Sequence, residues 1–276
     1  MKAMHVTKTK KIIPPVERPM RIIAVANQKG GTGKTTTAVS LAAVLAQGRK
    51  SVLLLDLDPQ ASASISLGVK DGGDGILAAL TEETPLVGAI RPVPLVPGLS
   101  LLPASRILSS AERILAAQYG AETRLKKAIL GLPKDWDYVV IDCPPSLGLL
   151  AISALVASHE VLIPVEPHIL SVHGLNDLMG LINTVRQREN PELVLAGILP
   201  CRVDVRKTVC RQVIELLKKH FGDSVLEHPI RENVRLSEAP SSQTPISIYD
   251  PKSSGTEDYR AVAKELLARQ KKRSES

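Results

Sequence analysis

The sequence predicts an α/β fold with a mostly parallel, twisted sheet and helices on both of its faces. Short apolar runs alternate with helical stretches from residue 21 onward, which is typical of a parallel sheet wrapped by helices. The runs are apolar at nearly every position rather than at every second one, as strands buried on both faces are. No break in composition marks a second domain in the 276 residues, so we expect a single domain.

The elements follow in order along the chain. The expected strands are 22–26, 52–56, 138–142, 161–165 and 194–199, and the clearest helices are 34–47 and 109–130. Glycine and proline are frequent from 71 to 103, which predicts a surface excursion with short elements. The domain is expected over 21–268, followed by a basic C-terminal tail over 269–276.

Residues 1–20 are predicted to form a flexible basic arm. Five basic side chains face one acid, Glu17, and the prolines at 14, 15 and 19 break any helix. The alternative is a solvated tail without function.

Composition excludes several classes of protein. No apolar run approaches the ~20 residues of a membrane span, and the N-terminus lacks the apolar core of a signal peptide, so we expect a cytoplasmic protein. Three scattered cysteines are too few for a disulfide scaffold or a tetrahedral zinc site. The net charge of +7 permits a polyanionic partner, but aromatic residues make up only 2% of the chain. That scarcity disfavours proteins that stack single-stranded bases and leaves duplex phosphates as the likelier nucleic-acid target.

The first strand runs into a glycine-rich loop, 27-NQKGGTGKTTTAVSLA-42, and then a helix, which is the context of a phosphate-binding loop. Gly30, Gly31 and Gly33 allow backbone N–H groups to turn toward phosphate oxygens, and the helix N-terminus adds its dipole. Lys34 is expected on the β- and γ-phosphates and Thr35 on Mg²⁺. Gln28 stands where the general pattern begins with glycine, so the loop is a deviant one. The fold is therefore predicted to be a single P-loop domain.

The segment 29-KGGTGKTT-36 resembles the signature of the ParA/MinD family of deviant Walker ATPases. The resemblance implies ATP and Mg²⁺ as cofactors and a homodimer in which Lys29 reaches the nucleotide of the partner subunit. A lysine in trans would couple dimer formation to the γ-phosphate. The alternatives are a phosphate contact within its own chain or an ordinary surface residue. The expected nucleotide contacts are Lys29, Gly30, Gly31, Thr32, Gly33, Lys34, Thr35 and Thr36.

Three aspartates follow predicted strands. Asp56 and Asp58 end the second strand, two residues apart, so we expect them on the same face and at the edge of the sheet where ligands bind. The resemblance makes Asp58 the residue that orients the attacking water, places Asp56 near the metal, and makes Asp142 the Walker B aspartate. Lys29, Lys34 and Asp58 are the expected catalytic residues, and Thr35, Asp58 and Asp142 the expected metal site.

The C-terminal third decides which branch of the family the chain resembles. Its segment NVRLSEAPS, followed by PI, YD and SSG, is similar to the ParA/Soj pattern, in which the arginine matched by Arg235 lies on a DNA-binding face. Upstream, in 202–222, a helix would place Lys207, Arg211 and Lys218 on one basic stripe interrupted by Glu215. Its apolar side chains, Val209, Val213, Leu216 and Leu217, are expected to face the core. The expected DNA contacts are Arg206, Lys207, Arg211, Lys218 and Arg235, although each could simply be a solvated charge. After Leu267 no large apolar residue remains, which disfavours the membrane-anchoring helix of MinD-like proteins.

The resemblance implies a ParA/Soj-type partition ATPase associated with the nucleoid. Its ATP-bound sandwich dimer would bind nonspecific double-stranded DNA. A ParB-like or other cargo adaptor would stimulate hydrolysis and so release the DNA. The cargo could be a chromosome, a plasmid or another body. Two rivals stay open: a MinD-like or other nucleotide-gated positioner that does not use DNA, and a metabolic ATP-dependent ligase or reductase subunit.

Overall fold

The computed structural model describes residues 20–69, 72–133 and 136–275, which form a seven-stranded sheet in the order β3-β4-β2-β5-β1-β6-β7. The strands are β1 (Arg21–Val25), β2 (Val52–Asp56), β3 (Arg91–Pro92), β4 (Leu99–Leu102), β5 (Tyr138–Asp142), β6 (Glu160–Val165) and β7 (Val194–Pro200). Every pairing is parallel except that of β3 with β4. The predicted α/β class is confirmed.

The central strands are buried on both faces. In β2, Leu53 and Leu55 pack into the core on one side of the sheet, and Val52 and Leu54 pack into the core on the other side. Because side chains alternate along a strand, both sets must be apolar when helices cover both faces. This explains why the strands read as continuous apolar runs in the sequence.

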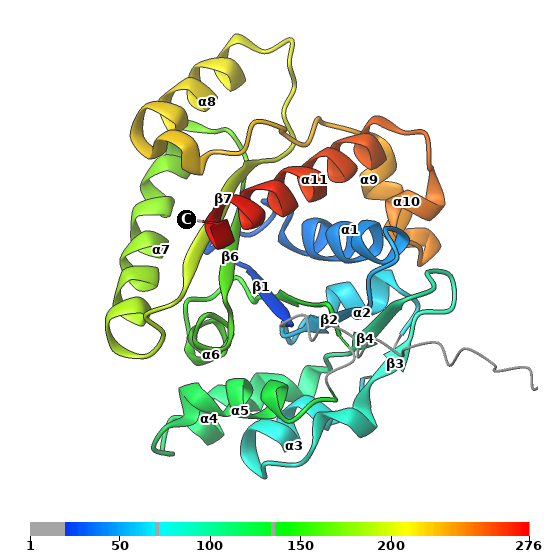
Figure 1. Ribbon diagram of the computed structural model, residues 1–276, viewed down its shortest axis with the longest axis vertical. Coiled ribbons are helices and arrows are strands. Elements are labelled where there is room, and N and C mark those ends of the chain that lie inside the picture. Colours follow the sequence, from blue (N-terminus) through cyan, green and yellow to red (C-terminus); the bar gives the residue numbers. More distant parts are fainter. Residues whose placement is uncertain (1–19, 70–71, 134–135, 276) are drawn as a thin grey trace, which may run out of the picture.

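Helices cover the two faces as separate layers (Figure 1). One layer comprises α1 (Lys34–Gln47), α2 (Ser62–Ser66), α9 (Val234–Glu238), α10 (Ile246–Tyr249) and α11 (Ser254–Glu275). The other comprises α3 (Gly75–Thr81), α4 (Ala111–Leu115), α5 (Arg124–Leu130), α6 (Leu149–Ala157), α7 (Ile169–Arg188) and α8 (Thr208–Phe221). Short 3₁₀ turns lie at Leu86–Ala89, Arg106–Ser110, Ala121–Thr123, Gly222–Ser224 and Ala239–Ser242.

Strand order fixes where a ligand can bind. From β1 the chain moves to β2, which lies beyond β5 on one side, and it later returns to β6 and β7 on the other side of β1. Parallel sheets bind ligands outside the carboxyl ends of their strands, at the point where the order reverses. That point is the end of β1, where residues 26–33 connect to α1.

Two expectations for the elements need correction. The segment 71–103 is not only a surface excursion, because it contains β4, whose Leu101 and Leu102 are fully buried beside β2. The expected helix 109–130 is divided into α4, a 3₁₀ turn and α5, since Gly120 adopts the left-handed conformation (φ 69°) between them. The five expected strands are confirmed to within one residue at each end.

The expected tail at 269–276 is instead the end of a helix. Helix α11 continues through Glu275, because its last turns are anchored to the sheet. Arg273 pairs with Glu160, which also pairs with Arg21, and the Arg21 guanidinium donates to Gln270 Oε1 at 2.9 Å. The expected N-terminal arm lies outside the described residues, apart from Met20. Among the described helices, none combines the length and the apolar character needed to cross a membrane.

Candidate functional site

The loop after β1 has the geometry of an anion cradle. Gly31 and Gly33 adopt left-handed conformations, with φ of 75° and 90°, which other residues rarely adopt. A Cβ built on Gly30 or Gly31 would meet no atom within 4 Å, so open space lies against this backbone. No side chain caps the N-terminus of α1 at Gly33. The exposed N–H groups and the helix dipole therefore favour an anion here.

Lys34, the first residue of α1, folds back over this loop. Its ammonium group donates a hydrogen bond to the Lys29 carbonyl at 3.1 Å, and the side chain is buried. Burial lowers the pKa of Lys34, and the nearby carboxylates of Asp142 and Asp58 oppose that shift. The cation is thus held at the mouth of the loop, facing acidic groups.

Lys29 differs from Lys34 although both lie in one loop. Its backbone N–H donates to Asn27 Oδ1 at 3.0 Å, and Asn27 in turn donates to the Pro164 carbonyl at 2.6 Å. The residue is exposed, and its ammonium group makes no ion pair with any residue that the structure describes. The backbone at Lys29 is held by a hydrogen bond, while its exposed ammonium group is available to an anion outside this site.

Asp56 and Asp142 stand opposite each other at the ends of β2 and β5, and both are completely buried. Asp56 accepts hydrogen bonds from the Ser64 N–H (2.8 Å) and the Ser64 hydroxyl (2.6 Å), and from the Asp58 N–H at 3.2 Å. Burial raises the pKa of Asp56 to about 6. Since its oxygens are occupied by protein donors, Asp56 holds α2 and the start of the following loop in place.

Asp142, by contrast, lacks partners. Neither of its oxygens makes a hydrogen bond of normal geometry with a described residue, although the Thr35 hydroxyl and the Lys34 ammonium lie near enough to act on it. Burial, followed by the charge of Asp56, raises its pKa well above the ordinary value, and Thr35 and Lys34 partly oppose this. Burying a carboxylate without partners costs free energy, so this position fits a carboxylate that binds a cation from outside the protein.

Asp58 lies just beyond the end of β2, not on the strand. Its Oδ1 accepts the Gln60 N–H at 2.9 Å, which closes a turn, and Asp58 borders the same cavity as Thr35 and Lys34. The argument from strand alternation therefore fails for this pair, because β2 ends at Asp56. Asp58 nevertheless lies at the edge of the sheet where ligands are expected to bind, because it lines the cavity.

Thr35, Asp58 and Asp142 are the residues that could hold a magnesium ion. Hard oxygen donors are what Mg²⁺ prefers, and it keeps several waters of its own. The unpartnered oxygens of Asp142 and the adjacent Thr35 hydroxyl fit this role. Among the described residues no group of three or more His, Cys, Asp or Glu forms a cluster that could hold a metal.

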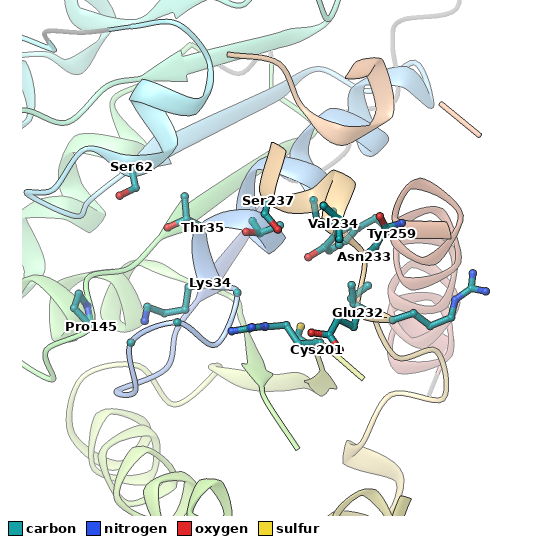
Figure 2. Close-up of a pocket in the computed structure, with 18 of the residues that line it drawn as sticks. Lys34, Thr35, Ser62, Pro145, Cys201, Glu232, Asn233, Val234, Ser237 and Tyr259 are labelled. Carbon is teal, nitrogen blue, oxygen red and sulfur yellow. The ribbon is translucent and has the colours of Figure 1, made fainter. Parts of the chain in front are cut away.

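The loop opens into a cavity of about 610 Å³. Figure 2 shows Lys34 and Thr35 between two groups of lining residues, with Pro145 and Ser62 on the left and Cys201, Asn233, Val234, Ser237 and Tyr259 on the right. The Tyr259 hydroxyl lies 3.1 Å from the Thr37 hydroxyl, and burial raises the pKa of the Cys201 thiol to about 12. A volume of this size suits a small organic ligand that carries an anionic group to the loop.

The C-terminal wall of this cavity was missed by sequence reasoning. In this segment the sequence assigned a role only to Arg235, on a DNA-binding face, and it did not predict that Asn233, Val234, Leu236 and Ser237 line the cavity. Asn233 begins α9, its side chain accepting the Arg235 N–H at 2.9 Å. The N-cap asparagine in NVRLSE could have indicated a helix start here, but nothing in the segment reveals that the helix packs beside the phosphate loop.

Comparison with known proteins decides the family. The profile of the AAA domain family matches residues 20–195. The sporulation initiation inhibitor protein Soj of Bacillus subtilis is 43% identical over 250 residues, covering 90% of this chain and 98% of Soj. The chromosome partitioning protein ParA of Myxococcus xanthus is 44% identical over 251 residues, covering 90% of this chain and 88% of that protein. This chain belongs to the ParA/Soj family of P-loop ATPases.

Solved structures agree with the fold and with a nucleotide site. A cobyrinic acid a,c-diamide synthase from Mycobacterium smegmatis, with bound ADP and magnesium, has a TM-score of 0.81 at 36% identity and covers 92% of this chain and 96% of its own. The same protein is also known with an ATP analogue and magnesium. The septum site-determining protein MinD of Pyrococcus horikoshii has a TM-score of 0.73 at 24% identity, covers 90% and 96%, and supports the fold alone. The ligands of the first protein agree with the expected ATP and Mg²⁺.

The residues expected on a DNA-binding face of this ParA/Soj chain are all exposed, but they differ in their partners. Arg206 pairs with Asp204 through two nitrogens, at 2.9 and 3.1 Å, and Lys207 lies near Asp204 and Glu232. Arg235 pairs with Glu238 at 2.8 Å and approaches Asp250.

Arg211 and Lys218, by contrast, have no acidic partner among the described residues, and Arg211 contacts only the Thr208 hydroxyl at 3.5 Å. These two side chains project from α8. On the same helix Val213 and Leu217 face the core as expected, whereas Val209 and Leu216 are 53% and 36% exposed. The expectation of a four-residue apolar face was wrong for those two, because α8 lies at the β7 edge of the sheet and only a narrow side of it packs. The charged stripe therefore has apolar neighbours.

Proposed function

We propose that this chain is a partition ATPase that hydrolyses ATP and uses the nucleotide to control a DNA-bound dimer. The observation that carries the proposal is the unpartnered, buried carboxylate of Asp142 opposite a glycine loop with its lysine folded inward. Such an arrangement is unfavourable unless a cation and a polyphosphate complete it. The ParA relative from Myxococcus xanthus supports the partition role, since chromosome partitioning is part of its name.

The reaction proposed is in-line attack of water on the γ-phosphate, with release of ADP and phosphate. Lys34 neutralises charge on the phosphates, and the backbone of the loop orients them. Asp58, at the rim of the cavity, positions the attacking water. Magnesium, when bound near Thr35 and Asp142, would neutralise the charge shared by the β- and γ-phosphates.

A sandwich homodimer is the proposed switch. Lys29 is exposed and without an ion pair in the part of the chain that the structure describes, so its ammonium is available to a phosphate on a facing subunit. A lysine that meets the nucleotide only in the dimer makes closure depend on the nucleotide bound.

The proposed matrix is nonspecific double-stranded DNA. Phosphate contacts by Arg211, Lys218 and Arg235 would give binding without base recognition and with a steep dependence on salt. A ParB-like or other cargo adaptor would then stimulate hydrolysis and release the dimer. The cargo itself is not specified by these residues.

The main alternative is a positioner that does not use DNA, and the second is a metabolic enzyme. The Mycobacterium smegmatis structure has the name of an amidating enzyme, at 36% identity. Identity to the Soj and ParA relatives is higher, at 43% and 44%, so we favour the partition role.

The decisive experiment measures binding of the full chain to a random-sequence duplex with ATP, with ADP and without nucleotide, at two salt concentrations. Binding that requires ATP and weakens steeply with salt is the expected result. Binding in no nucleotide state would leave the ATPase site standing and overturn the DNA matrix. Gly180→Ala, at an exposed helical position with open space around it, is the control, because it should leave DNA binding unchanged.

A further inference from the structure

The loop between β5 and α6 connects the buried Asp142 to the first turn of α6 and borders the cavity on the way. It begins after Asp142, and it brings Pro145 to the rim of the cavity. It ends at Gly148, where α6 starts. Because the loop is short, the position of the first turn of α6 determines where the residues after Asp142 lie.

The first turn of α6 receives its cap from another helix. Gly148 stands at the N-cap position, where no side chain of the loop accepts a hydrogen bond. Glu112, on α4, places its carboxylate there instead, and Glu112 Oε1 accepts the Leu150 N–H at 3.5 Å. Helix α4 packs directly beside α6 (Figure 1). A carboxylate is favoured at this end of a helix because the first N–H groups have no partners within the helix.

Two further observations show that this contact is close and specific. A Cβ built on Gly148 would overlap the Glu112 carboxylate and lie 2.8 Å from its Cδ atom. The backbone at Gly148 has φ of −77° and ψ of −169°, which any residue can adopt. An alanine at 148 would therefore force the flexible Glu112 carboxylate to move, whereas the turn itself accepts any residue.

Glu112 has no other strong partner. It is half-buried, and it makes no ion pair within the described ranges 20–69, 72–133 and 136–275. The one hydrogen bond that its carboxylate accepts from a described residue comes from the first turn of α6.

We infer that Glu112 is a positioning residue for the Asp142–Gly148 loop, and that it sets the geometry of this loop for hydrolysis. The inference rests on the proposed ATPase function. It assigns to α4 a role that no motif in the sequence revealed. Helix α4 fixes the first turn of α6, and α6 in turn fixes the loop that follows β5 at the cavity, without contact between α4 and the nucleotide.

A double-mutant cycle on the full chain tests the inference. Glu112→Ala removes the carboxylate, Gly148→Ala displaces it, and the double variant has nothing left to displace. The measurements are kcat and KM for ATP hydrolysis, the affinity for ADP, and hydrogen exchange of residues 143–152. Gly180→Ala and Glu189→Ala, both exposed and remote from this contact, are the controls.

Each single variant is expected to lower kcat roughly threefold to tenfold, while the ADP affinity changes by less than about twofold. The double variant should lose no more than the poorer single one, and Glu112→Gln should retain part of the rate because it keeps the acceptor. Hydrogen exchange at 143–152 should quicken in both single variants, with residues 27–36 unchanged.

Multiplied losses in the double variant, or a Glu112→Ala protein with normal kcat and normal exchange at 143–152, would overturn the inference. Failure of the proposed function gives a different result. In that case the unaltered chain would not hydrolyse ATP, and the exchange measurement alone would decide whether Glu112 positions the loop.

Discussion

The ammonium group of Lys34 donates a hydrogen bond to the backbone carbonyl of Lys29, 3.1 Å away, while Lys29 itself is exposed. One lysine is thus buried against the loop, and the other is in contact with solvent. The two lysines are close in sequence but have different surroundings. Their replacement should therefore affect different properties, nucleotide affinity in one case and dimer formation in the other.

Lys34→Ala is expected to lower the affinity for ADP and for ATP by at least about tenfold, because charge-assisted contacts to phosphate contribute a few kcal/mol. Lys29→Ala should leave ADP affinity within about twofold and should abolish the ATP-dependent dimer. Equilibrium binding of a fluorescent ADP analogue and sedimentation with ATP separate the two effects. Equal loss of ADP binding in both variants would show that Lys29 acts within its own chain.

Asp142→Asn should stabilise the metal-free protein while destroying its function. The substitution removes a buried charge that has no hydrogen-bond partner and that faces Asp56 across the paired strands. We expect a rise in Tm of a few degrees, which corresponds to about 1 to 2 kcal/mol in a domain of this size. The same variant should lose any effect of Mg²⁺ on Tm in the presence of ADP.

The matched control for that prediction is Asp56→Asn. Its carboxylate accepts hydrogen bonds from Ser64, so its replacement should lower Tm rather than raise it. If both variants shift Tm in the same direction, the presence or absence of hydrogen-bond donors is not what distinguishes the two aspartates.

Asp58→Ala is expected to bind ATP but to hydrolyse it at least about a hundredfold more slowly, because positioning of water supplies a large part of such reactions. The ATP-bound dimer should then accumulate and remain on DNA. Single-turnover hydrolysis and DNA retention after dilution are the measurements. A variant that turns over ATP at the normal rate would remove Asp58 from this role.

The ion pairs on the expected DNA face predict how much each basic residue contributes to DNA binding. Arg211 and Lys218 lack acidic partners among the described residues, whereas Arg206 is held by Asp204. We therefore expect Arg211→Ala and Lys218→Ala each to weaken DNA binding about threefold to tenfold, with Arg206→Ala weaker in effect. Titrations at several salt concentrations should show the salt slope falling by about one for each lost phosphate contact.

Sequence reasoning succeeded where a local pattern determines a structure. The apolar runs located the core strands, and the glycine spacing located the turn at Gly31 and Gly33. It failed where packing between distant segments decides. Nothing local distinguishes Asp56, whose oxygens are occupied by Ser64, from Asp142, whose oxygens are not. Likewise, the cap from Glu112 to Leu150 joins residues 38 positions apart and requires both helices to be in place.

A last prediction concerns stability away from the cavity, at Glu265 on α11. Its carboxylate accepts hydrogen bonds from the Glu227 and His228 N–H groups, from His228 Nδ1, and from Arg269. Burial acts to raise the pKa of Glu265, but these donors outweigh it, and the pKa lies below its ordinary value of 4.5. The ionised form is therefore the one that the fold stabilises.

A depressed pKa in the folded state contributes stability that is present above the pKa of the unfolded chain and is lost as pH falls through the folded value. Glu265→Gln should accordingly lower the free energy of unfolding by about 1 to 2 kcal/mol near pH 7. The difference from the unaltered protein should shrink as the pH falls below about 4.5, and it should be lost as the pH falls through the lower folded pKa of Glu265, where the glutamate becomes neutral as the glutamine is. Denaturant unfolding at both pH values measures it, with Glu275→Gln, 64% exposed and 3.8 Å from Lys271, as the control. A cost that is the same at both pH values would mean that Glu265 acts through packing and not through its charge.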